Sequence, residues 1–203
     1  MRKGFTFLDE AVPGIRWDSK YATWDNMTGK PMEGYEANRI VVSEELGKGL
    51  LKARERAASF GYGLLVWDGY RPQRASDELV EWLTDAKNEQ RKGVYYPKLS
   101  HMELLTKGYV HKRSAHSRGC AVDLTLYFLE TGDLMPMGTD YEFMDERSAH
   151  GADGLTITEL KNREVLRYIM EQSGFTACSH KWWHYELRKE PYPNRYFNFP
   201  IKE

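Results

Sequence analysis

Hydrophobic and polar residues alternate with a changing period along the chain, and the clearest helical period covers residues 44–60. Apolar side chains recur there every three to four positions, which predicts an amphipathic helix. The buried stripe of this helix would consist of Leu46, Leu50, Ala53 and Ala57. Ser43 precedes the segment as a capping residue, and Gly61 follows it as a suitable left-handed stop. The apolar run Leu64–Trp67 comes next and is typical of a buried strand.

Three further segments have a recognisable period. Residues 73–87 carry apolar side chains at helical spacing, whereas residues 121–128 alternate with the period of two that predicts a strand. Thr156 and Glu159 have the spacing of a capping box, which predicts a helix that continues to about Ser173.

The rest of the chain is less regular. Residues 1–40 suggest short strands and loops, residues 88–113 a polar loop, and residues 129–155 an ordered loop region. The aromatic segment 175–187 is expected to form another strand. Without any linker or repeat, residues 1–203 are predicted to form a single α+β domain, with helices around a small, mostly antiparallel sheet.

Composition narrows the classes of protein to consider. Of the 203 residues, 41% are hydrophobic and 29% charged, which is enough for a buried core, and the net charge of -1 argues against a nucleic-acid partner. No apolar stretch approaches the roughly 18 residues of a membrane span. Because Cys120 and Cys178 are too few for a disulfide framework and the N-terminus does not resemble a leader, we expect a cytoplasmic protein without a membrane partner. The oligomeric state is left open, a homo-oligomer included.

The first candidate chemistry lies in the sequence S-A-H-S-R-G-C-A-V-D at residues 114–123. His116 falls in a turn, and Asp123 falls in the following strand among apolar residues. A buried carboxylate is costly unless it is paired, hydrogen-bonded or bound to a metal. The segment therefore supports two interpretations equally: a metal site that uses both side chains, or a buried Asp bonded to backbone amides beside a surface His.

The second candidate is H-K-W-W-H at residues 180–184. Its spacing matches the helical zinc motif H-E-x-x-H, but Lys181 occupies the position of the general base and the flanking aromatic residues favour a strand. A strand leaves His184 as a third candidate ligand. Taken alone, His180 and His184 would be ordinary half-buried histidines.

Together, His116, Asp123 and His184 supply two imidazoles and one carboxylate, the ligand set of a catalytic zinc site with one open position. Such a site also needs a cation for the developing oxyanion. Arg71, in the turn D-G-Y-R-P, is a candidate for that role, and the alternative is a structural pairing with Asp68. The sequence has no phosphate-binding loop, dinucleotide fingerprint or nucleophile elbow.

The same segments carry a resemblance to a known family. W-D-G-Y-R-P, S-A-H-S-R-G-C-A-V-D-L-T-L-Y and W-W-H-Y resemble segments of the D-alanyl-D-alanine dipeptidases of vancomycin resistance, which belong to the zinc D,D-peptidases. The likeness extends over nearly the whole chain and includes G-F-T-F-L-D-E, K-Y-A-T-W-D-N and F-M-D-E-R-S.

This resemblance implies an activity and a set of roles. The implied reaction is hydrolysis of the cell-wall precursor D-alanyl-D-alanine to two D-alanines in the cytoplasm, with one Zn²⁺ per chain as cofactor and the small dipeptide as partner. The implied residues are His116, Asp123 and His184 for zinc, Arg71 for the tetrahedral intermediate, Tyr21, Asp68 and Ser114 for substrate, and Glu142 for the substrate ammonium.

Lys181 departs from the family pattern, in which a Glu three residues before the last His is the catalytic base. An ammonium cannot accept a proton, and neutralising it at pH 7 requires its pKa to fall by roughly 3 units. Three explanations are open: a substitution that disables the enzyme, a neighbour such as His180 acting as the base, or a protein that binds zinc and ligand without fast turnover. Because 181 and 184 differ by an odd number, we predict an irregularity near residues 181–183 that brings both to one face.

Overall fold

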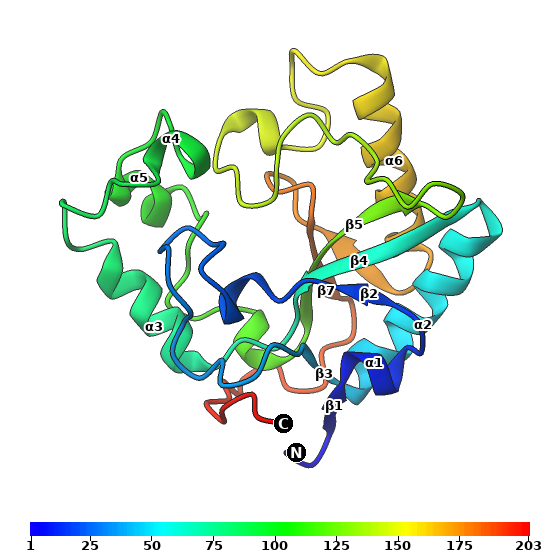
Figure 1. Cartoon of the computed structure of the whole chain (residues 1–203), viewed down its shortest axis with the longest axis horizontal. Coiled ribbons are helices and arrows are strands. Elements are labelled where there is room, and N and C mark those ends of the chain that lie inside the picture. The colour runs from blue at the N-terminus through cyan, green and yellow to red at the C-terminus, as the bar shows by residue number, and fades with distance from the viewer.

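A five-stranded sheet forms the centre of the computed structural model, which describes all 203 residues (Figure 1). Its strand order is β2-β4-β5-β7-β6, and only the pair β2 and β4 is parallel. The strands are β2 (Arg16–Trp17), β4 (Tyr62–Asp68), β5 (Ala121–Phe128), β6 (Phe175–Ala177) and β7 (His184–Leu187). The predicted α+β class and mostly antiparallel sheet are confirmed.

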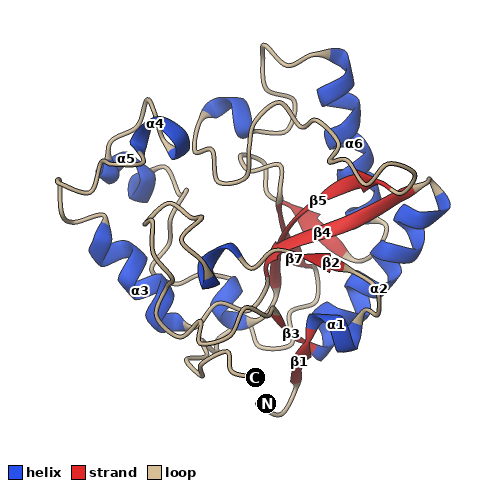
Figure 2. Cartoon of the chain, viewed as in Figure 1, coloured by secondary structure: helices blue, strands red, loops and turns tan.

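Two long helices and a small second sheet lie near the central sheet. Helices α2 (Glu44–Ser59) and α6 (Ile157–Glu171) lie together on the right of the molecule (Figure 2). The second sheet pairs β1 (Phe5–Phe7) with β3 (Val41–Ser43), and the short α1 (Leu8–Ala11) follows β1. None of the helices is both long enough and apolar enough to cross a membrane.

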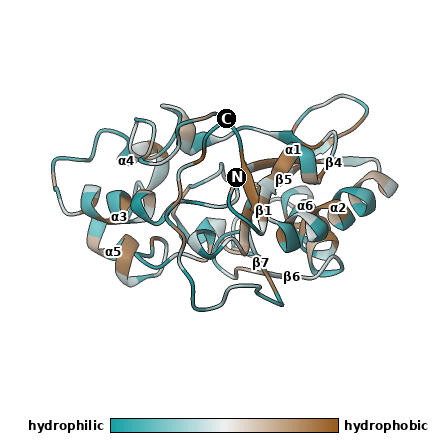
Figure 3. Cartoon of the chain, turned by 90° about the horizontal axis from the view of Figure 1, so that it is seen from below, coloured by the Kyte–Doolittle hydropathy of each residue, from teal (hydrophilic) through white to brown (hydrophobic).

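The sequence prediction for α2 is confirmed in detail. Ser43 Oγ accepts a hydrogen bond from Leu46 N at 3.2 Å, and Gly61 has the left-handed φ of 83° expected after the helix. All four stripe residues, Leu46, Leu50, Ala53 and Ala57, are fully buried. Figure 3 shows the resulting division of α2 into hydrophobic and hydrophilic faces.

Three helices occupy the opposite side of the molecule: α3 (Gln73–Trp82), α4 (Lys92–Tyr95) and α5 (His101–Thr106) (Figure 2). Helix α3 ends five residues before the predicted boundary at 87. The prediction of a loop over 88–113 is wrong in part, because α4 and α5 fall within it. Helix α5 begins with a capping box, in which Ser100 and Glu103 satisfy one another's backbone N–H groups.

The aromatic segment 175–187 forms two strands instead of one. Strand β6 ends at Ala177, a turn follows, and β7 begins at His184. The predicted irregularity near 181–183 is thereby confirmed. The turn lets Lys181 approach the same region as His184, which an unbroken strand would not allow.

A one-residue shift in register separates the two ends of the pair β4–β5. Val66 pairs with Leu124, but Asp68, two positions further, pairs with Asp123, one position back. The extra residue, Trp67, makes a β-bulge. Because paired residues on adjacent strands point to the same face, the bulge turns Asp68 toward the side that carries Asp123.

Candidate metal centre and active site

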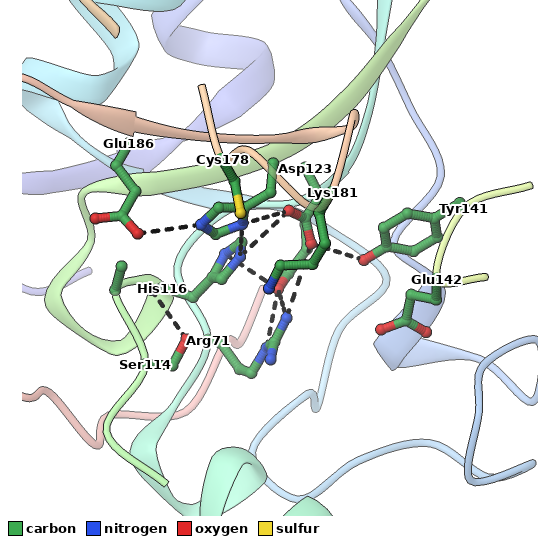
Figure 4. Close-up of polar contacts among 12 residues, drawn as sticks. Arg71, Ser114, His116, Asp123, Tyr141, Glu142, Cys178, Lys181 and Glu186 are labelled. Carbon is green, nitrogen blue, oxygen red and sulfur yellow. Dashed lines mark hydrogen bonds and ion pairs between the residues drawn. The ribbon is translucent and has the colours of Figure 1, made fainter. Parts of the chain in front are cut away.

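Three buried side chains from separate elements converge at one point (Figure 4). His116 begins the 3₁₀ turn His116–Arg118, Asp123 lies on β5, and His184 lies opposite Asp123 in the β5–β7 ladder. Asp123 Oδ1 is 2.8 Å from His184 Nδ1 and 3.4 Å from His116 Nε2, and the two ring nitrogens are 3.2 Å apart. All three residues are buried. The sequence prediction that these three residues meet is confirmed.

The three donor atoms fit a tetrahedral metal ion. Bonds of about 2.0–2.1 Å to zinc place neighbouring ligand atoms about 3.3 Å apart. The observed separations of 2.8, 3.2 and 3.4 Å surround that value. Since only three protein atoms take part, the fourth corner remains for a small ligand, as in catalytic zinc sites.

Hydrogen bonds on the far side of each imidazole reinforce this fit. His116 Nδ1 donates to Gly69 O at 2.7 Å, and His184 Nε2 donates to Glu186 Oε1 at 3.2 Å. These bonds leave His116 Nε2 and His184 Nδ1 as lone-pair acceptors that face each other. Two lone pairs on nitrogen atoms 3.2 Å apart repel one another. A cation between the two nitrogen atoms would be bound by both and would remove this repulsion.

Ionisation of the carboxylate is favoured at this position. Burial alone would raise the pKa of Asp123, but the neighbouring His116 and His184 hold that pKa well below its usual range. For His184, burial alone would lower the pKa, and the neighbouring carboxylates of Asp123 and Glu186 outweigh burial and raise the pKa. The centre therefore holds an ionised carboxylate ready to accept a metal.

Arg71 follows β4 and is held by two bonds to one oxygen. Its Nε and Nη2 donate to Asp68 Oδ2 at 3.0 and 2.8 Å, while Tyr35 donates its hydroxyl to Asp68 Oδ1 at 2.8 Å. The guanidinium also lies over the ring of Tyr21, 4.4 Å from its centroid. Arg71 thus makes the structural pairing with Asp68 considered from the sequence and still borders the metal centre, with Nη2 3.9 Å from Asp123 Oδ2.

A cavity of about 160 Å³ opens onto these groups. Its lining includes the three candidate ligands and five other predicted site residues: Tyr21, Arg71, Ser114, Glu142 and Lys181. Asp68 is the exception, because it lies behind Arg71 and does not reach the cavity wall. Ser114 Oγ accepts a hydrogen bond from His116 N at 3.2 Å and so also orients the turn that carries His116.

Glu142 is an acid in an unusual setting. Its φ of 59° is in the left-handed region, where a non-glycine residue is strained. Its carboxylate accepts a hydrogen bond from the Tyr21 hydroxyl, and its buried Oε2 has no partner. Burial raises the pKa of Glu142 to about 7. Strain, burial and an unsatisfied oxygen in one residue are typical of a binding group.

Lys181 lies in the turn before β7 and is 9% exposed. Its ammonium donates to Tyr109 O at 3.4 Å, and no carboxylate lies within 4.0 Å of it. The helical alternative for residues 180–184 is excluded, since the segment is a turn that leads into a strand.

Sequence reasoning missed two residues that contact the candidate ligands directly. Tyr141 donates its hydroxyl to Asp123 Oδ2 at 3.0 Å, and Glu186 bonds His184 from behind. Glu186 could have been predicted from the sequence, because it lies two residues after His184 and therefore on the same side of a strand. Nothing in the local pattern distinguished Tyr141 from the other tyrosines.

Comparisons with known proteins agree with this geometry. Residues 1–202 match the peptidase family described as D-ala-D-ala dipeptidase. The chain belongs to the D-alanyl-D-alanine dipeptidase family. The resemblance inferred from the sequence motifs is therefore confirmed.

Individual members of the D-alanyl-D-alanine dipeptidase family match over their whole length. The chain is 59% identical to the D-alanyl-D-alanine dipeptidase of Enterococcus faecium over 202 residues, which cover 100% of both chains. It is 53% identical to the enzyme of the same name from Enterococcus faecalis, over 99% of this chain and 100% of the relative. A solved structure of the LdcB LD-carboxypeptidase has a TM-score of 0.51 at 13% identity, over 94% of this chain and 70% of that chain, and shares the fold.

Proposed function

We propose that this protein is a zinc-dependent dipeptidase that hydrolyses D-alanyl-D-alanine to two D-alanines and so removes a peptidoglycan precursor. The observation that carries the proposal is the convergence of His116, Asp123 and His184 beside Arg71 in a cavity of about 160 Å³. The names of the full-length relatives support the substrate. Both cysteines are free thiols, which agrees with the cytoplasm as the proposed location.

The two histidines and the aspartate would hold one zinc ion per chain. Bound zinc supplies a Lewis acid and lowers the pKa of a coordinated water to about 7. The protein contributes the orientation of the ligands: Gly69 and Glu186 fix the two imidazoles, and Tyr141 fixes the carboxylate.

Arg71 would meet the negative charge that develops on the carbonyl oxygen. Asp68 occupies its Nε and Nη2, which leaves Nη1 free for the substrate while the guanidinium stays in place. A donor that is already oriented needs no reorganisation as charge develops, and loss of one such donor typically slows catalysis by about 10²–10³-fold.

Glu142 and Tyr21 would bind the ammonium of the dipeptide. An ammonium supplies the hydrogen bonds that the buried Oε2 of Glu142 lacks, and it also stabilises the ionised form of this carboxyl. Ser114, on the cavity wall, would contact the substrate through its hydroxyl. Asp68 would act through Arg71.

Lys181 stands at the position where the family has a glutamate that acts as the base. Hydrolysis in this chain would then rest on the metal centre and Arg71, with no carboxylate at position 181 to take the proton of the attacking water. Loss of a general base typically costs about 10²–10⁴-fold in rate. We therefore expect slower turnover than a glutamate at position 181 would give.

The test combines metal analysis with D-alanine release from D-alanyl-D-alanine. We expect about one zinc per chain, and we expect His116→Ala to lose both the zinc and the activity. His101→Ala, which alters a histidine outside the cavity, should retain both. The proposed reaction is wrong if the zinc-loaded protein and its Lys181→Glu variant both fail to release D-alanine.

A further inference from the structure

Lys181 is a buried cation without an anionic partner. Its side chain lines the cavity, is 9% exposed and has no carboxylate within 4.0 Å. The only protein acceptor of its ammonium is Tyr109 O at 3.4 Å. An ammonium has three N–H donors, so at least two remain for a ligand. Burial of a charge without a counter-charge is costly, and an incoming anion would remove that cost.

The neighbours of Lys181 show which wall of the cavity its charge affects. Burial and the Lys181 charge together lower the pKa of His111, and the Lys181 charge adds to the His180 hydrogen bond that lowers the pKa of Cys178 against burial. At His184 the same charge opposes the rise of the pKa. For Glu142, the acid assigned to the substrate ammonium, burial raises the pKa, and the Tyr21 hydrogen bond and the Arg71 charge oppose that rise. Figure 4 likewise places Glu142 apart from Lys181, with His116 and Asp123 on the Lys181 side.

The cavity therefore carries separate sites for opposite charges. Glu142 with Tyr21 offers a negative site, and Lys181 offers a positive site that no protein group neutralises. A free dipeptide is a zwitterion whose ammonium and carboxylate are separated by one peptide bond. Its two ends match the two charged sites, and the peptide bond would lie between them, near the metal centre.

We propose that Lys181 binds the C-terminal carboxylate of the substrate. This inference rests on the proposed function and refines its substrate class: the protein would select dipeptides with a free carboxylate over those with a blocked one. The residue at the family's base position would then serve in substrate recognition. Charge-assisted hydrogen bonds of this kind are about twice as strong as neutral ones.

Binding of two small probes tests the proposal without relying on turnover. Zinc-loaded protein is titrated calorimetrically with D-alanine, which has a carboxylate, and with D-alaninamide, whose carboxylate is replaced by a neutral amide. We expect the unmodified protein to prefer D-alanine by about tenfold or more. Lys181→Met should abolish this preference by weakening D-alanine alone, whereas Lys181→Arg should keep part of it. Lys52→Met, on the exposed surface of α2, should change nothing.

Each outcome has a distinct meaning. Metal analysis and circular dichroism of Lys181→Met first establish that the variant is folded and holds zinc. If that variant then binds D-alanine as tightly as the unmodified protein, the carboxylate role of Lys181 is overturned, even if D-alanyl-D-alanine is hydrolysed. If the preference depends on Lys181 but no dipeptide is hydrolysed, the carboxylate site stands and the proposed reaction fails.

Discussion

Tyr141 donates its hydroxyl to Asp123 Oδ2 at 3.0 Å, while the other oxygen of this carboxylate faces His116 and His184. The tyrosine ring is fixed by stacking on Trp67, with centroids 4.5 Å apart. One oxygen of Asp123 is thus held from behind, and the other is directed into the metal centre. Tyr141 is therefore a positioning residue for the carboxylate ligand.

Removal of this hydroxyl should weaken metal binding. We expect Tyr141→Phe to lower zinc affinity by about tenfold or more, since the loss of a bond to a metal ligand typically has an effect of this size. Competition with a chromophoric chelator measures the change. Tyr168→Phe, at a half-exposed position on α6, serves as the matched control and should bind zinc normally. Equal zinc affinity in all three proteins would show that Tyr141 does not position Asp123.

A carboxylate at position 181 should accelerate hydrolysis. We expect Lys181→Glu to raise kcat for D-alanyl-D-alanine by about 10²-fold or more, because it supplies a proton acceptor beside the metal centre. It should also raise KM, because it replaces the proposed partner of the substrate carboxylate with a like charge. Release of D-alanine, measured with a coupled oxidase, gives both constants. Lys181→Gln removes the charge without adding a base, so a comparable rise of kcat in that variant would contradict this explanation.

Glu142 should make stability depend on pH. Its pKa of about 7 in the folded protein exceeds its ordinary value of 4.5. The folded protein therefore holds a proton between these pH values that the unfolded chain releases, and rising pH through this window lowers the free energy of unfolding. The full effect corresponds to about 3 kcal/mol.

Urea denaturation of zinc-loaded protein at pH 5 and pH 7.5 measures this contribution. Glu142→Gln cannot titrate, so it should lose less stability than the unmodified protein over the same interval. Parallel pH profiles for the two proteins would show that burial of Glu142 does not raise its pKa as described.

Ser43 links the start of α2 to the segment that carries His116. Its hydroxyl accepts from Leu46 N at 3.2 Å and donates to Gly119 O at 2.6 Å. We expect Ser43→Ala to lower the free energy of unfolding by about 1–2 kcal/mol through loss of the cap. Ser59→Ala, at the exposed end of the same helix, should change it by less than about 0.5 kcal/mol. Chemical denaturation compares the two, and equal stabilities would mean that the cap is dispensable.

Much of the fold was predictable wherever a local signal had a single interpretation. The helix after Ser43 has a cap, an apolar stripe and a glycine stop, and the strand 121–128 has strict alternation. Helix α5 was missed although Ser100 and Glu103 have the same capping spacing as Thr156 and Glu159. Its surroundings are polar and the helix is short, so the apolar spacing that predicts a helix repeats too few times to be recognised.

The sequence predicted those residues of the candidate site whose chemistry is distinctive. Two imidazoles and a carboxylate, here His116, His184 and Asp123, form a recognisable set of zinc ligands. The family resemblance indicated that these three side chains lie together. Tyr141 and Tyr35 act through single hydrogen bonds across the fold. Such contacts depend on how distant loops are placed, which a local period does not encode.

The bulge at Trp67 decides which face of the sheet Asp68 reaches. In a regular ladder of the same sequence, Trp67 would pair with Asp123, and Asp68 would pair with Val122 and point to the opposite face. Arg71 would then lose the carboxylate that holds its Nε and Nη2 beside the cavity. We infer that this bulge is as strictly required as the identity of the ligands, although Trp67 itself binds no metal.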